Sequence, residues 1–198
     1  MKKWLIPVIV IVVLGIIVYS LTAGVNNTAV EYEESVLKNW ADVENAYQRR
    51  SDLIPNLVST LEGSADFERG TLTDVIEARA KATSVNVDAG NLNPEQIQQF
   101  QQAQGGLSSA LSRLLVSVER YPDIKSNQNF LQLQSQLEGT ENRISVARNR
   151  YNEAVRQYNT YIRKFPNNIF AGMFGFERKA TFEAEEGAEN APDVEFDF

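Results

Sequence analysis

The sequence predicts an all-α protein in which an N-terminal transmembrane helix is followed by an up-and-down bundle of four long antiparallel helices. Two observations predict this fold class. One apolar stretch is long enough to cross a bilayer, and the rest of the chain repeats apolar residues with the helical period, without the two-residue alternation of strands. We expect a transmembrane anchor over residues 1–26, a helical bundle over 27–182 and an acidic disordered tail over 183–198.

A long uncharged run lies near the N-terminus: no Asp, Glu, Lys or Arg occurs between Trp4 and Val30. Because a helix rises about 1.5 Å per residue, roughly 20 apolar residues cross a hydrocarbon core of about 30 Å. A cleaved secretory signal is the alternative, since Lys2 and Lys3 precede the apolar core and a small-residue site ends at Ala23. The run exceeds the roughly 7 to 15 residues of a signal core, which favours an uncleaved anchor.

The flanking charges indicate the orientation of this anchor. Lys2 and Lys3 lie on one side of it, whereas Glu31, Glu33 and Glu34 follow on the other. Positively charged flanks stay on the cytoplasmic side of a membrane. We therefore expect a single-pass protein of the cell inner (plasma) membrane whose bundle faces the extracytoplasmic side.

Two helices are expected in the first half of the bundle. The first begins near Thr28, where Glu31 stands at capping-box spacing, or continues from the membrane helix without a break. Its apolar face comprises Tyr32, Val36, Trp40, Val43 and Tyr47. The second begins near Asp52 as its cap, with Pro55 in the first turn, and fades by Ser84.

The second half of the bundle contains the two clearest helices. Asn93 as cap, Pro94 at the first position and Gln96 reaching back begin the third helix, and the chain turns at residues 121–123. The fourth helix has about 35 residues and ends at Pro166. Its core-facing positions alternate three and four residues apart, as in a left-handed bundle: Phe130, Leu133, Leu137, Thr140, Ile144, Ala147, Tyr151, Ala154, Tyr158, Tyr161 and Phe165.

An apolar patch follows the fourth helix and contains Ile169, Phe170, Met173, Phe174 and Phe176. Patches of this size are seldom left in water, so we expect this one to fold back on one end of the bundle. A contact with a partner or with the membrane surface is the alternative. Residues 183–198 contain Glu and Asp but neither Lys nor Arg, which is typical of a disordered acidic tail.

Several kinds of chemistry lack their usual residues. The chain has no cysteine and no histidine, which removes disulfides, thiolate zinc sites, thiol catalysis, the commonest general base and the commonest transition-metal ligand. Acidic pairs such as Glu33-Glu34 lack the loop spacing of a calcium site. A net charge of −7 gives no basic surface for nucleic acid. We therefore predict no catalytic, cofactor-binding or metal-binding residue, and no enzyme.

Four charged residues fall on or beside the apolar faces. Glu68 and Arg79 share the stripe of the second helix, and Glu141 and Arg148 flank the core-facing positions of the fourth. Our hypothesis is a partly buried charge network between these two helices, because an unpaired buried charge is costly. Its simplest role is to set the alignment of the helices, and a binding or proton-relay site is the alternative.

Three parts of the sequence resemble a known family: residues 77–80, residues 119–159 and the run Gln48-Arg49-Arg50-Ser51-Asp52-Leu53-Ile54-Pro55-Asn56-Leu57-Val58. With these motifs the chain resembles the LemA family of bacterial membrane proteins over about residues 27–182. The resemblance implies a single-pass anchor followed by a four-helix up-and-down bundle, and it implies no reaction. One departure is Phe67 before Glu68, where we expect a His-Glu pair in many relatives, so no histidine-dependent role carries over to this chain.

The outer face of the fourth helix is rich in asparagine, a poor helix former, with Asn142, Asn149, Asn152 and Asn159 placed where a partner could read them. Our first hypothesis for function is a membrane-anchored, non-enzymatic interaction or scaffold module at the cell envelope. It would offer a polar helix face to a protein partner or to copies of itself. The alternative is an extracytoplasmic bundle that senses a small ligand and works through a partner.

Overall fold

The structure, a computed structural model, describes residues 4–63 and 67–183, and every regular element in these two ranges is a helix. The helices are α1 (Leu5–Glu62), α2 (Arg69–Ser84), α3 (Pro94–Val118), α4 (Pro122–Lys125), α5 (Gln128–Arg163) and α6 (Asn167–Met173). The predicted all-α class is confirmed. A separate anchor followed by four bundle helices is not the arrangement observed, because the elements differ in number and bounds. Apart from Glu183, the predicted acidic tail lies outside the described residues.

The longest helix, α1, joins the predicted anchor and the first bundle helix in one element of 58 residues. Of the two possibilities at Thr28, the continuous one is therefore observed. The prediction of a new helix beginning at Asp52 is wrong, because Asp52 and Pro55 lie inside α1, which ends at Glu62. Proline is common in the first turn of a helix, whereas inside a helix it leaves one carbonyl without its backbone donor.

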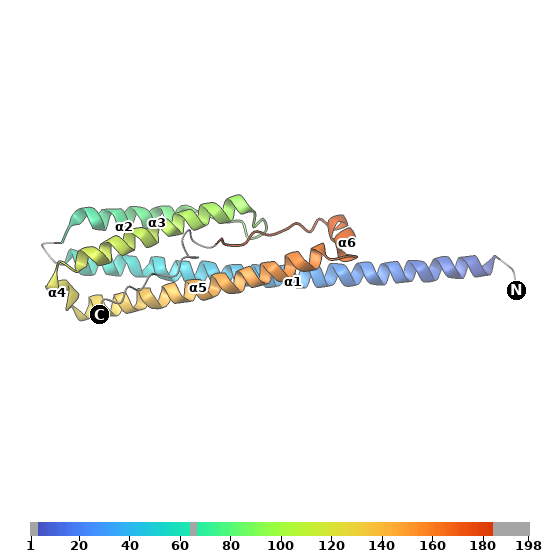
Figure 1. The fold of residues 1–198 in the computed structure, drawn as a ribbon, viewed down its shortest axis with the longest axis horizontal. Coiled ribbons are helices and arrows are strands. Elements are labelled where there is room, and N and C mark those ends of the chain that lie inside the picture. The colour runs from blue at the N-terminus through green and yellow to red at the C-terminus, as the bar shows by residue number, and fades with distance from the viewer. Residues whose placement is uncertain (1–3, 64–66, 184–198) are drawn as a thin grey trace, which may run out of the picture.

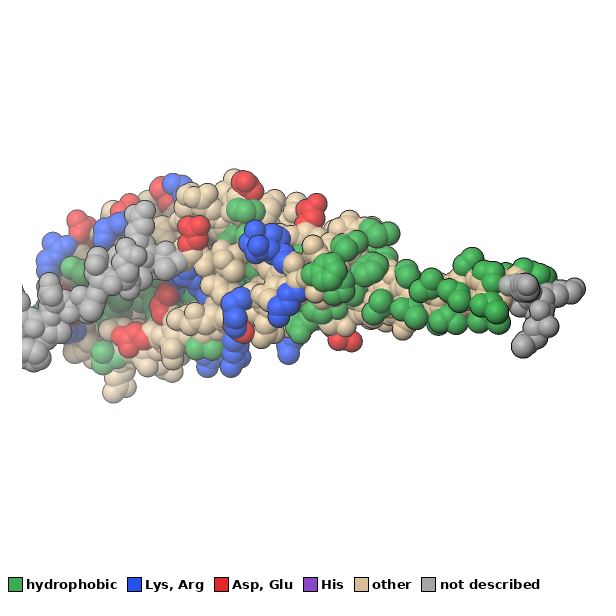
Figure 2. All heavy atoms as spheres, turned by 45° about the vertical axis from the view of Figure 1, so that its right-hand side comes forward, with side chains coloured by type: hydrophobic (Ala, Val, Ile, Leu, Met, Phe, Trp, Pro, Cys, Tyr) green, Lys and Arg blue, Asp and Glu red, His purple; other side chains and the backbone are tan. Residues whose placement is uncertain are grey.

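The N-terminal part of α1 projects beyond the other helices (Figures 1 and 2). Among the residues placed in the structure, α1 is the one helix long and apolar enough to cross a membrane. Its side chains from Ile6 to Leu21 are exposed, and burial against the bundle begins near Thr22. The exposed part is thus close in length to the roughly 20 residues that span a bilayer core.

The four long helices alternate in direction, as Figure 1 shows for α1, α2, α3 and α5. They pack mainly as two pairs, α1 with α5 and α2 with α3, and α1 also contacts α2. The buried side chains form two clusters. One lies nearer the projecting helix around Trp40, Tyr151 and Tyr158, and the other lies toward the far end around Leu57 and Leu114.

The predicted start of α3 is confirmed. The side-chain oxygen of Asn93 accepts a hydrogen bond from the backbone N–H of Gln96 at 2.9 Å, and Pro94 is the first helical residue. Helix α5 has 36 residues, close to the predicted length, and Asn127 caps it. The turn predicted at residues 121–123 overlaps the short helix α4, which ends at Lys125.

The chain after α5 folds back on the bundle, which confirms in part the prediction made for the apolar patch. Helix α6 packs against both α1 and α5, with Ala171 buried. Gly175 then adopts a φ of 77°, which favours glycine, and the chain reverses. Residues 176–183, which we call the C-terminal segment, run without helical structure beside α5 (Figure 1). The fold-back leaves several side chains of the predicted apolar patch exposed.

Candidate functional site

Arg50 of α1 is a buried cation at a point where three long helices meet. Its guanidinium donates to Gln104 of α3, at 2.9 Å to Oε1 and 3.2 Å to the backbone carbonyl, and to Ser108 Oγ at 2.7 Å. Glu141 of α5 forms an ion pair with it at 2.5 Å. The side chain of Arg50 is 1% exposed and that of Glu141 is 49% exposed, so the pair runs from the core to the surface. We call these four residues the Arg50 cluster.

The next residue, Ser51, connects α1 to the fourth long helix, α2. Arg79 Nε donates to the Ser51 carbonyl at 2.9 Å and to the Ser51 hydroxyl at 3.1 Å. In a regular helix this carbonyl accepts from the backbone N–H four residues later, and that residue is Pro55, which has no N–H. Arg79 therefore supplies the donor that Pro55 lacks. This contact explains how α1 accommodates a proline in its interior.

The sequence hypothesis placed Glu68 with Arg79 on one stripe of a helix, and this requires correction. Glu68 instead precedes α2 as its N-cap residue and pairs with Arg120 at 3.1 Å, with both side chains more than half exposed. Phe67, the departure from the expected family pattern, is buried and packs against the Tyr121 ring at 5.1 Å. The start of α2 lies too late for Glu68 to join the apolar face.

Glu141 and Arg148, the other two residues of the predicted network, do not pair with each other in the contacts observed. Glu141 pairs with Arg50, whereas the Arg148 guanidinium lies 4.9 Å from the centre of the Phe182 ring and donates to the Glu183 carbonyl at 3.0 Å. Glu68, Arg79, Glu141 and Arg148 thus each contact different residues. Arg79 is half-buried and joins α2 to α1, whereas the fully buried cation that joins three helices is Arg50, which the hypothesis did not include.

Sequence reasoning misses Arg50, although a signal for it is present. The apolar face of the first predicted bundle helix, at Val43 and Tyr47, continues with the same three-and-four spacing to Arg50 and Ile54. Ending that helix before Asp52 hides the continuation. Once α1 runs on to Glu62, Arg50 falls in the middle of a core-facing stripe and must find polar partners there.

Phe182 of the C-terminal segment closes the side of the bundle between α3 and α5. Its ring stacks on Trp40 with centroids 5.9 Å apart, and it meets the Tyr151 ring edge-on at 5.4 Å. Phe100 of α3 lies 6.3 Å away. Phe182 is 4% exposed, so a residue from outside the long helices completes the core.

Two asparagines of α5 hold the main chain of the C-terminal segment. Asn152 accepts from the Phe182 N–H at 2.9 Å and donates to the Phe182 carbonyl at 3.1 Å. Asn159 makes the same pair of bonds with Lys179, at 3.0 and 2.8 Å. Seven helical residues rise about 10 Å, and three extended residues cover about the same distance, so the two spacings match. These amides bind peptide groups, whatever side chains the peptide carries.

An open cavity of about 770 Å³, which we call the α3–α5 groove, lies beside the C-terminal segment. Arg156 and Lys179 at the groove are paired with carboxylates, at 2.6 and 2.9 Å. Arg163 and Arg178 are exposed at the groove and have no carboxylate partner within residues 4–63 and 67–183. Its polar lining includes Gln98, Gln101, Asn152, Arg156, Asn159, Arg163, Arg178, Lys179 and Glu183.

Two buried tyrosines near the groove have perturbed acidities. Burial raises the pKa of Tyr151 above its usual range, and its hydroxyl donates to the Ala180 carbonyl at 2.8 Å. Burial also raises the pKa of Tyr158, with a further contribution from the charges of Glu33 and Glu177. Both phenols therefore stay protonated at neutral pH, and their positions support packing.

The groups gathered here suit binding. Across the described part of the chain, no three His, Cys, Asp or Glu side chains are arranged to hold a metal ion. The lining of the α3–α5 groove consists largely of amides and guanidiniums. Amides bind peptide groups, and guanidiniums bind carboxylates. The arrangement can therefore hold an extended or acidic segment of chain.

The sequence is similar to one protein family and to several named bacterial proteins. The family model described as the LemA family matches residues 39–196, a range that contains both the Arg50 cluster and the α3–α5 groove. The magnetosome protein MamQ 1 of Paramagnetospirillum magneticum is 29% identical over 196 residues, covering 88% of this chain and 71% of that protein. Protein LemA of Metamycoplasma hominis is 24% identical over 185 residues, covering 93% of this chain and 80% of that protein.

Proposed function

This chain belongs to the LemA family, and from that premise we propose that it is a single-pass, membrane-anchored interaction module of the cell envelope that catalyses no reaction. Its bundle faces the extracytoplasmic side, and its binding surface is the α3–α5 groove. The observation that carries the proposal is the pair of Asn152 and Asn159, which hold an extended main chain beside an open cavity whose lining includes the exposed cations Arg163 and Arg178. The partner is an extended, acidic segment of another envelope protein or of a second copy of this chain.

The shape of α1 supports this role. One continuous helix carries both the apolar segment and the core of the bundle, so the groove is held at a set distance from the anchor. Such an arrangement presents a binding surface above the membrane without a flexible linker. The Arg50 cluster stiffens the same assembly, because it ties α1 to α3 and α5.

Photocrosslinking in intact membranes tests the proposal. A photoreactive amino acid replaces Gln98, which lines the groove from α3, or Val116, which is 71% exposed on the same helix but does not line the groove. We expect a discrete crosslinked product from position 98 and none from position 116. Mass spectrometry of the product then identifies the partner as another protein or as a second copy.

A charge change provides the matched control. Replacing Arg163 and Arg178 with Ala should reduce the yield of the crosslink from position 98, because two cations of the groove lining are removed. Arg143→Ala, which removes an exposed cation elsewhere on α5, should leave the yield unchanged. Equal yields from positions 98 and 116, or a yield insensitive to the groove arginines, would refute the groove as the binding surface.

A further inference from the structure

Four large apolar side chains stay exposed where α5 ends and α6 begins and ends. Phe165 is 82% exposed, Ile169 53%, Met173 75% and Phe174 45%, and we call these four residues the α6 face. Ile169 and Met173 are four residues apart, so they share one side of α6, while Ala171 is buried against the bundle. The fold-back of α6 thus covers only its inner side. An exposed apolar patch of this kind marks a contact with another apolar surface.

The position of α6 along α1 identifies that surface. Helix α6 packs on α1 beside the point where α1 begins to project from the bundle (Figure 1), and burial along α1 begins near Thr22. Counting about 20 residues at roughly 1.5 Å each from Trp4 places the edge of the hydrocarbon core near Gly24. The headgroup layer extends about 5–8 Å further, which corresponds to some five residues of helix. The residues of α1 from about 24 to 29, and α6 beside them, therefore lie at the level of the headgroups.

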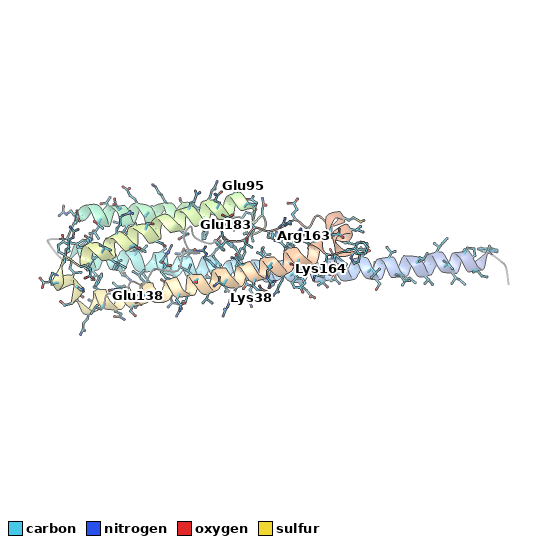
Figure 3. The ribbon with its side chains drawn as sticks, viewed as in Figure 1. Lys38, Glu95, Glu138, Arg163, Lys164 and Glu183 are labelled. Carbon is cyan, nitrogen blue, oxygen red and sulfur yellow. The ribbon has the colours of Figure 1, made fainter. Side chains whose placement is uncertain are left out.

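The side chains around α6 also fit a position at the level of the lipid headgroups. Figure 2 shows hydrophobic side chains gathered where the bundle meets the projecting helix and continuing along that helix. Figure 3 shows Arg163 and Lys164 at the end of α5 beside α6, and both residues are exposed. Arginine and lysine beside an apolar surface are typical of segments that lie in a bilayer interface, where they contact lipid phosphates.

From these observations we propose that the α6 face inserts into the interface of the bilayer that α1 crosses, on the side of the bundle. The inference rests on the proposed anchoring by α1. The protein then contacts the bilayer twice, through the spanning part of α1 and through the interfacial α6 face. Together these contacts fix the tilt of the bundle and the direction in which the α3–α5 groove faces. A single helix without the second contact would leave rotation and tilt free.

The absence of cysteine from the sequence permits a direct test on the full chain. A spin label is attached to Met173→Cys, Val12→Cys or Val116→Cys in vesicles of phosphatidylcholine and phosphatidylglycerol. Molecular oxygen concentrates in the bilayer, whereas a polar nickel complex stays in water. The ratio of the collision rates of oxygen and nickel with the spin label, the oxygen-to-nickel ratio, therefore increases with the depth of the label in the bilayer. All three native side chains are exposed in the structure, at 75%, 54% and 71%.

We expect the oxygen-to-nickel ratio at position 173 to be several-fold higher than at position 116 and lower than at position 12. A ratio at 173 equal to that at 116, with a high ratio at 12, would overturn the insertion of the α6 face and leave the anchor intact. A low ratio at position 12 would overturn the anchoring itself and, with it, the inference. Should Met173→Cys fail to fold, Ile169→Cys reports on the same side of α6.

A second comparison distinguishes insertion driven by the native side chains of α6 from insertion driven by the spin label. With the label at Phe174→Cys, the double change Ile169→Ser and Met173→Ser should lower the ratio toward the value at position 116, because it removes the apolar side of α6. An unchanged ratio would mean that the label itself enters the bilayer and would overturn the proposal.

Discussion

Pro55 and Arg79 show, at the scale of single residues, how a side chain far along the sequence can complete a backbone pattern. The proline leaves the Ser51 carbonyl without a donor, and the Arg79 guanidinium supplies one at 2.9 Å. Because Ser51 is buried, an unsatisfied carbonyl there would cost free energy. The same contact docks α2 on α1.

We expect Arg79→Ala to lower the free energy of unfolding by about 1–3 kcal/mol, because a charged donor is lost and a buried acceptor remains. In a Pro55→Ala background the cost should be smaller, since residue 55 then offers its own N–H to Ser51. Urea denaturation of the four proteins measures the coupling as a double-mutant cycle. Equal costs of Arg79→Ala in the two backgrounds would contradict the link.

Two tyrosines of α5 form a natural pair for comparison. Tyr151→Phe removes the hydrogen bond to the Ala180 carbonyl and should cost about 1 kcal/mol. Tyr158→Phe removes a buried hydroxyl that has no hydrogen-bond partner among the described residues, so stability should stay the same or rise. Thermal denaturation at neutral pH distinguishes the two. A larger loss for Tyr158→Phe would show that this hydroxyl has a stabilising partner.

The same tyrosines predict how stability changes at alkaline pH. Burial raises the pKa of both phenols in the folded state above that of the unfolded chain. A group shifted in this direction contributes its full stability below the unfolded pKa, which is about 10 for tyrosine, and loses it as the pH rises further. The melting temperature should therefore fall above about pH 10, and the fall should be smaller in the double Tyr151→Phe, Tyr158→Phe protein. Identical alkaline profiles would contradict this account.

The element that matters most for the groove is the C-terminal segment, a non-helical stretch built into a helical bundle. Its residues Lys179 and Phe182 match Asn159 and Asn152 because three extended residues span the same distance as seven helical ones. This register gives a reason for two of the four asparagines on the outer face of α5. We have no corresponding account of Asn142 and Asn149, which make no such contact with the described part of the segment.

Asn159→Ala should loosen the segment locally. Loss of two hydrogen bonds to Lys179 should favour local opening by roughly 1 kcal/mol, which corresponds to about fivefold faster exchange of the Lys179 amide. Asn149→Ala changes an exposed asparagine of the same helix and should leave that exchange rate unchanged. Hydrogen exchange measured by NMR compares the two. Equal effects of both changes would contradict a specific clamp.

For the molecule as a whole, the adjacent residues Arg50 and Ser51 bring all four long helices together. Arg50 contacts α3 and α5, and Ser51 receives Arg79 from α2. A cluster of this kind sets the alignment of helices, because a slip of one turn would leave the guanidinium buried without its partners. We propose that this is its role.

Arg50→Ala should lower the free energy of unfolding by about 3 kcal/mol, as expected when one member of a buried ionic cluster is removed. Part of this loss comes from Gln104 and Ser108, which would lose the hydrogen-bond donor of Arg50. Glu141 contributes less, because it is half exposed and water can hydrate it. Arg49→Ala, at the neighbouring exposed position, should change stability by less than about 0.5 kcal/mol. Urea denaturation followed by circular dichroism measures both, and similar effects of the two changes would refute the role of Arg50.

The amino-acid sequence by itself determined the helical class, the apolar span of α1, the cap at Asn93 and the length of α5. These features depend on residues within a few positions of one another, through periodicity and capping. Only the tertiary structure decided that α1 continues through Pro55, that Arg50 is the buried cation and that Phe182 completes the core. The physical reason is that each depends on a donor, acceptor or ring brought close from 28 or more residues away, which no local pattern specifies.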